Sequence, residues 1–206
     1  MPQQTLTNQQ YEMYLNFTNL FENLNTSRLA LEIFNDLPPY IFTVPASSSG
    51  KYHPEYTLGD GGLFRHMLAA AYILNHLLSI DINRNLFTPV ERDLLRVAAL
   101  FHDGRKSGSQ EDYERDPKTK FEHPILMANA VKELAKSSEF KKEYFDYIAE
   151  AIESHMGQWN TSKNSSIVLP LPITDAQKLV FTADYLASRK DLEFLFNIPE
   201  RRTNLF

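Results

Sequence analysis

The residues with the clearest chemical potential are histidines and aspartates that a helix would present to a dry core. His66 has apolar neighbours four, seven and eleven residues further on, which lie on its own helical face. Asp184 has apolar neighbours three and four residues before it and three residues after it. Because burying an unpaired carboxylate is costly, Asp184 needs a cation or a strong hydrogen-bond donor.

Three more histidines and a second aspartate occupy similar positions. His155 continues an apolar helical stripe, and His123 opens a helix. His102 and Asp103 end the apolar run 97–101, just before Gly104. Each expected helix thus donates one group, apart from the adjacent pair, and this distribution is typical of a metal cluster in a helical bundle. Imidazole and carboxylate ligands favour one or two divalent ions: Mn, Fe, Ni, Co, Zn or Mg.

Each of these residues also has an ordinary explanation. A lone histidine on an apolar face is more often a satisfied core residue than a ligand. The sixth histidine, His76, lies on a different helical face from His66 and is interpreted as a surface residue. The metal hypothesis therefore depends on the ordered set and not on any single member.

The elements that must position these groups are helices. Apolar spacing predicts helices at 7–24, 27–36, 62–79, 88–103, 124–137, 139–156 and 174–190. Two prolines reduce the best extended segment, 167–173, to a loop or an edge. Two long loops, 38–61 and 104–122, remain, and loops of this length usually have a function. The sequence predicts an all-α bundle.

Composition narrows the class of protein. The 206 residues are 43% apolar and 23% charged, as in an ordinary globular domain. The absence of cysteine excludes disulfides, thiolate metal sites and cysteine nucleophiles. A net charge of −5 argues against non-specific binding to long duplex nucleic acid. The sequence shows no signal peptide, and the longest apolar run, Met67–Leu74, is too short for a membrane span, so we expect a cytoplasmic protein.

The ordered set resembles the HD superfamily of metal-dependent phosphohydrolases. The segment FHDGRK is similar to the HD-x-x-K signature of that family, and GGLFRH is similar to the GGL-x-x-H lead-in to its first histidine. The similarity runs from about residue 40 to 190. It implies an all-α HD-domain bundle at 46–190, an N-terminal helical arm at 1–45 that packs on it, and a C-terminal tail at 191–206.

The resemblance also implies a ligand set. One divalent ion is expected on four residues: His66, His102, Asp103 and Asp184. Asp103 would bridge to a second ion on His123 and His155, as in the HD-GYP cyclic-dinucleotide phosphodiesterases. Met156 stands where that subfamily has another histidine, so the second ion is expected to be weaker or to be completed by water and substrate. The glycine, tyrosine and proline of the GYP motif are also missing.

A nearer resemblance is to the HD domain of bacterial 3′-to-5′ exoribonucleases. The shared features are a proline–alanine pair, a histidine, and the glycines before the metal histidine: Pro45-Ala46, His53, Gly61-Gly62-Leu63 and His66. Those enzymes also carry an OB-fold for nucleic acid, for which this chain has neither the room nor the strands. Polynucleotide substrates are therefore not expected.

The implied chemistry is hydrolysis of a phosphate ester. Divalent ions lower the pKa of a bound water, and the hydroxide attacks phosphorus in line. Asp103 and Lys106 are the expected catalytic residues. Asp103 orients the water, and Lys106 binds a phosphate oxygen and stabilises charge in the transition state. The alternative for Lys106 is a cation that stabilises a helix C-terminus.

Further residues are candidates for substrate binding. His53 could protonate a leaving group or bind phosphate. The Gly61 and Gly62 amides precede a helix and could face an anion. Trp159 could stack a base or pack under a loop, and Arg189 could reach substrate or form a surface ion pair. The aromatic residues of the arm fit core packing or a homodimer interface better than ligand binding: Tyr11, Tyr14, Phe17 and Phe21.

The predicted function is that of a metal-dependent phosphohydrolase acting on a nucleotide-type substrate, with a phosphodiester favoured. The expected substrate is a small nucleotide or the 3′ end of a short oligonucleotide. The alternative is a non-catalytic HD-type sensor or scaffold module that keeps its metal for structure. The intact ligand set and Lys106 argue against this alternative.

Overall fold

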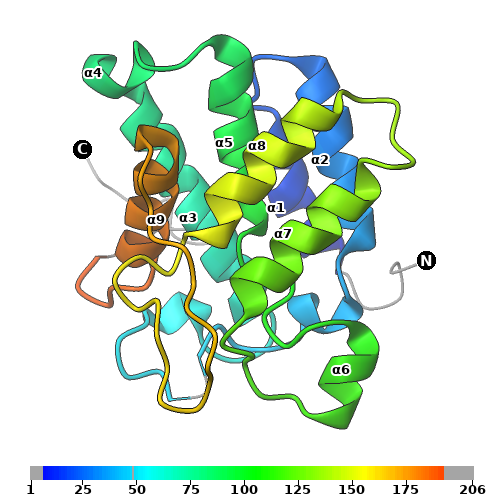
Figure 1. The fold of residues 1–206 in the computed structure, drawn as a ribbon, viewed down its shortest axis with the longest axis vertical. Helices are drawn as coiled ribbons and strands as arrows, with labels where there is room; N and C mark the ends of the chain where they lie inside the picture. Colours follow the sequence, from blue (N-terminus) through cyan, green and yellow to red (C-terminus); the bar gives the residue numbers. More distant parts are fainter. Residues whose placement is uncertain (1–6, 48, 193–206) are drawn as a thin grey trace, which may run out of the picture.

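The structure is a computed structural model that describes residues 7–47 and 49–192, and its regular elements are helices joined by loops (Figure 1). Its longer helices are α1 (Asn8–Thr18), α2 (Leu24–Asp36), α3 (Gly62–Ser79), α5 (Pro89–Phe101), α7 (His123–Leu134), α8 (Lys142–Glu153) and α9 (Asp175–Ala187). Shorter turns are α4 (Asp81–Arg84), α6 (Gln110–Arg115), η2 (Pro39–Phe42) and η3 (Glu55–Thr57). The described residues contain no strand, only an isolated bridge between Ser162 and Ser165. The all-α prediction is confirmed.

Helix α3 is the centre of the bundle. Twelve of its 18 residues are buried, because its apolar run leaves few polar positions for a solvent face. It packs against α9 and α5, while α5 also packs against α8. Helices α7 and α8 lie side by side at the front of the view (Figure 1). The starts of α3 and α7, the end of α9 and the residues that follow α5 and α8 lie close together inside the bundle.

Capping residues explain where several of these helices begin. Thr88 starts α5 and Thr174 starts α9, and each forms a capping box with the residue three positions on. His123 is the first residue of α7, one position before the predicted start, and Glu122 occupies the cap position. Pro89 and Pro124 lie in first turns, where a missing N–H costs nothing.

The predicted helix 7–24 is wrong at its C-terminal end, because it stops at Thr18 and a new helix starts at Leu24. The carboxylate of Asp93 accepts hydrogen bonds from the Glu22 and Asn23 amides at 3.0 and 2.8 Å. The Asn23 side chain then caps α2. Because Asp93 lies about seventy residues away in sequence, local periodicity could not reveal this break.

The N-terminal arm packs on the rest of the chain. Tyr14 and Phe17 are buried, and the Tyr14 ring stacks on Phe34 with centroids 4.1 Å apart. Glu22 accepts hydrogen bonds from Arg92 and Arg96 of α5. Core packing thus accounts for Tyr14 and Phe17. The segments 1–6 and 193–206, which include most of the predicted tail, lie outside the described residues.

Within the described part of the chain, no helix combines the length and the apolar character that a membrane span requires.

Candidate metal centre

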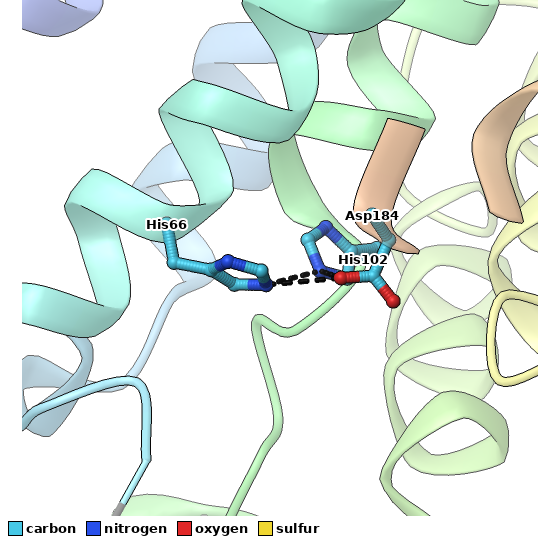
Figure 2. A group of neighbouring side chains, drawn as sticks. All are labelled: His66, His102 and Asp184. Carbon is cyan, nitrogen blue, oxygen red and sulfur yellow. Dashed lines mark hydrogen bonds and ion pairs between the residues drawn. The ribbon is translucent and has the colours of Figure 1, made fainter. Parts of the chain in front are cut away.

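Three side chains from three helices converge at the centre of the bundle (Figure 2). His66 lies near the start of α3, His102 directly follows α5, and Asp184 lies near the end of α9. The Nε2 atoms of His66 and His102 are 3.3 Å apart. Each is close to Asp184 Oδ1, at 3.0 Å for His66 and 3.2 Å for His102. Both histidines are buried, and the Asp184 side chain is 19% exposed.

A second pair of histidines faces the first. His123 begins α7, and His155 follows the end of α8. Their Nε2 atoms are 3.2 Å apart, and both residues are buried. The packing of α7 against α8 brings the two rings together across 32 positions of sequence.

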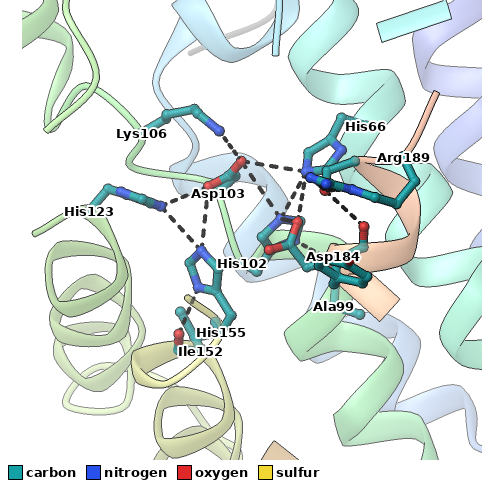
Figure 3. Close-up of polar contacts among 12 residues, drawn as sticks. His66, Ala99, His102, Asp103, Lys106, His123, Ile152, His155, Asp184 and Arg189 are labelled. Carbon is teal, nitrogen blue, oxygen red and sulfur yellow. Dashed lines mark hydrogen bonds and ion pairs between the residues drawn. The ribbon is translucent and has the colours of Figure 1, made fainter. Parts of the chain in front are cut away.

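Asp103 lies between the two histidine pairs (Figure 3). Its Oδ1 is 3.0 Å from His123 Nε2 and 3.7 Å from His155 Nε2. Its Oδ2 is 3.7 Å from His66 Nε2 and 3.6 Å from His102 Nε2. Lys106 also donates a hydrogen bond to Oδ2. One carboxylate therefore offers one oxygen to each pair.

The orientation of the imidazole rings fits a cation. The Nδ1 atoms of three histidines lie 2.7–2.8 Å from backbone carbonyls: His102 from Ala99, His123 from Lys120, and His155 from Ile152. A proton on Nδ1 leaves the Nε2 lone pair free, which is how metal-binding histidines are usually oriented. Two such lone pairs facing each other at 3.2 Å repel unless a cation or a proton lies between them. The donor set fits a divalent metal ion.

The carboxylates carry the negative charge of the site. Burial alone would raise the pKa of Asp103, but Lys106, His102 and hydrogen bonds from the second histidine pair hold it well below its usual value. Burial also opposes ionisation of Asp184, and His102 and His66 outweigh it, so that its pKa is well below the usual value. Burial likewise opposes the charge on His102, yet the two carboxylates raise its pKa. Both aspartates are therefore anionic at neutral pH and could serve as metal ligands.

His53 also reaches this centre. Its ring centroid lies 5.5 Å from that of His66. Burial, followed by the electrostatic effects of His66 and Lys106, lowers its pKa to about 4. His53 is thus a neutral imidazole at pH 7 whose ring lies beside that of His66.

Gly61 and Gly62 have a packing role. The Gly62 amide donates to the Gly59 carbonyl at 3.0 Å, so it is engaged within the chain. A Cβ at Gly62 would lie 2.0 Å from the Thr57 carbonyl oxygen. These glycines let the C-terminal part of the 38–61 loop lie directly on the start of α3.

Trp159 and Arg189 lie beside the centre, not among the groups that converge on Asp103. The Trp159 ring stacks on Tyr185, with centroids 5.6 Å apart and planes 15° apart. The Arg189 guanidinium lies 4.6 Å from the centre of the same Tyr185 ring. His76 is exposed, as predicted.

Sequence reasoning missed Arg65, which holds the lead-in loop. Its guanidinium donates to the Tyr56, Leu58 and Asp60 carbonyls. A charged residue directly before His66, in the first turn of a buried helix, was the available signal.

Comparison with known proteins agrees with this geometry. The HD-domain family model matches residues 63–189, which is 127 of the 206 residues and includes both histidine pairs and both aspartates. No curated protein and no solved structure gives a significant match to the chain. The chain belongs to the HD-domain family.

Proposed function

We propose that this HD-domain protein is a metal-dependent phosphohydrolase that cleaves a phosphate ester of a nucleotide-type substrate, with a phosphodiester favoured. One observation carries the proposal. Four histidines and two aspartates from five segments of the chain meet at one buried point, and the two aspartates are anionic. Such a donor set suits a divalent ion of the Mn, Fe, Ni, Co, Zn or Mg type.

Two overlapping groups of side chains would hold the metal. His66, His102 and Asp184 offer ligand atoms that all lie within 4.8 Å of one another, and His102, Asp103 and His155 do the same. His123 adds a ligand beside Asp103 Oδ1. We therefore propose two ions that share Asp103. When bound, divalent ions neutralise phosphate oxygens and lower the pKa of a coordinated water toward neutrality.

The chain's own residues position the substrate. Lys106 has 16% of its side chain exposed, and Asp103 holds its ammonium at the edge of the centre. There it can bind a phosphate oxygen and offset the charge that grows in the transition state. His53, a neutral imidazole, can donate a hydrogen bond to a second phosphate oxygen or to the leaving group.

The kind of substrate is proposed from the sequence. The motif order Pro45-Ala46, His53 and Gly61-Gly62 is similar to the HD domain of bacterial 3′-to-5′ exoribonucleases. The acidic balance of the chain favours a small nucleotide or a short oligonucleotide end over a long polynucleotide.

Hydrolysis of bis(p-nitrophenyl) phosphate with Mn²⁺ tests the proposal. We expect turnover by the wild-type protein and its loss in the double variant His102→Ala, Asp103→Ala, with helical circular dichroism retained. The matched control is His76→Ala, which removes an exposed histidine from the same helix as His66. A protein that holds metal at full occupancy but shows no turnover with any divalent ion would be a sensor or scaffold. Wild-type activity in the double variant would contradict the assigned centre.

A further inference from the structure

A row of aromatic rings with one guanidinium runs beside the metal centre. Arg189 lies between two tyrosine rings, 5.5 Å from the centroid of Tyr52 and 4.6 Å from that of Tyr185. Tyr185 in turn stacks on Trp159. We call these four residues the aromatic row. They come from three separate segments of the chain: the 38–61 loop, the turn after α8, and the end of α9 with the residues that follow it.

The row is held in place by the backbone. Gly157 has φ of +54°, and a Cβ there would lie 2.2 Å from the Phe181 ring. The turn that carries Trp159 can therefore lie tightly on α9 only with glycine at this position. At the other end of the row, the Lys190 amide donates to the Tyr52 carbonyl at 2.8 Å. This bond fixes the loop to the residues after α9.

The row adjoins the metal-binding side chains. Tyr185 follows Asp184 directly, so their Cα atoms are about 3.8 Å apart. Tyr52 precedes His53, whose ring lies 5.5 Å from that of His66. Figure 3 places Arg189 on the same side of the centre as His66 and Asp184.

Two rings of the row are open to solvent. Trp159 is 44% exposed and Tyr52 is 53% exposed. Tyr185 covers one face of the indole, as their nearly parallel planes show. A planar ligand can stack on exposed indole, and such stacking tolerates any base because every base has a π face.

We propose that the aromatic row binds the nucleobase of the substrate, which stacks on Trp159 while its phosphate lies at the metal centre. Tyr185 packs on the indole, Arg189 packs on Tyr185, and Tyr52 packs on Arg189. The inference rests on the proposed function, and it assigns the substrate class as a phosphate ester that carries a planar aromatic base.

Trp159 is the sole tryptophan of the chain, so its fluorescence reports directly on the row. The indole is excited at the red edge of its absorption band, where adenine does not absorb. With Mn²⁺ present, we expect adenosine 5′-monophosphate to quench this emission saturably. Ribose 5-phosphate, which has the same phosphate and no base, should leave the emission nearly unchanged.

Calorimetric binding to variants gives a second measurement. Trp159→Ala should weaken the binding of adenosine 5′-monophosphate roughly 5- to 150-fold and leave that of ribose 5-phosphate unchanged. Trp159→Phe keeps a ring and should restore most of the affinity. The wild-type titration remains decisive if the alanine variant does not fold.

The outcomes separate this inference from the proposed function. Equal fluorescence responses to the two phosphates, or equal affinities for them, would overturn base binding even if the protein hydrolyses bis(p-nitrophenyl) phosphate. Selective quenching by adenosine 5′-monophosphate in a protein without hydrolytic activity would support the aromatic row and refute only the hydrolysis.

Discussion

The substitution Gly62→Ala sets two physical effects against each other. Gly62 is the first residue of α3, and its φ is not in the left-handed region. Helix propensity alone predicts that alanine stabilises the protein by up to about 1 kcal/mol. The structure predicts the opposite, since the new Cβ would lie 2.0 Å from the Thr57 carbonyl oxygen and 2.5 Å from its carbonyl carbon.

The size of the effect follows from these distances. Real Cβ contacts almost never fall below 3.0 Å, so the backbone at Thr57 must move by at least 3.0 − 2.0 = 1.0 Å. That carbonyl accepts the Ala46 amide at 3.0 Å, and the movement breaks this hydrogen bond. Strain of about 2 kcal/mol and a lost bond of about 1–2 kcal/mol outweigh the helical gain. The net loss is about 2–3 kcal/mol, or a fall in Tm of roughly 5–10 °C.

Thermal unfolding followed by circular dichroism measures this loss. The matched control is Gly59→Ala, because a Cβ at Gly59 would meet nothing within 4 Å. Its φ of +65° costs about 1 kcal/mol in alanine, which lowers Tm by about 2–4 °C. Because the loop also carries His53, Gly62→Ala should slow phosphate-ester hydrolysis by up to about 100-fold. A Gly62→Ala protein as stable as wild type would show that the Thr57 carbonyl does not restrict this position.

Three further predictions concern the ions and charges. Mn²⁺ at about 100 times its Kd should raise the unfolding free energy by about 2.7 kcal/mol, and Asp184→Asn should abolish that gain in a thermal-shift assay. Hydrogen bonds from Arg92 lower the pKa of Glu22 to about 2. The stability that ionised Glu22 contributes is therefore present above about pH 4.5 and is lost as the pH falls toward 2. The free energy of unfolding of Glu22→Gln, measured with urea, should lack this part of the pH dependence. Lys106→Ala should reduce kcat about 100-fold with metal content unchanged, whereas loss of metal would assign Lys106 a purely structural role.

Much of the site could be predicted from the sequence because a polar residue on an apolar helical stripe must be buried and therefore needs a partner. Asp184 and His66 lie on stripes of apolar residues, so each was expected to face inward, and the structure places their side-chain atoms 3.0 Å apart. The helices that carry them were also predicted, because their apolar spacing is regular. The fold class follows from that regularity.

Other features depend on contacts between distant residues. The charge of Arg65 in the first turn of a buried helix indicates that it needs partners, but the sequence does not show that they are carbonyls of an irregular loop. Tyr52 and Tyr185 are separated by more than a hundred residues, and only the folded chain brings both of them to Arg189. The two long loops also contain short turns such as α6, which are too short to give a periodic signal. A homodimer and a cytoplasmic location remain predictions from the sequence.

We propose that these histidines and aspartates hold a divalent ion, which anomalous diffraction from crystals grown with Mn²⁺ can locate. We expect a strong anomalous peak about 2 Å from the Nε2 atoms of His66 and His102 and from Asp184 Oδ1. No peak among these atoms in fully loaded crystals, or a peak only at the protein surface, would contradict this proposal.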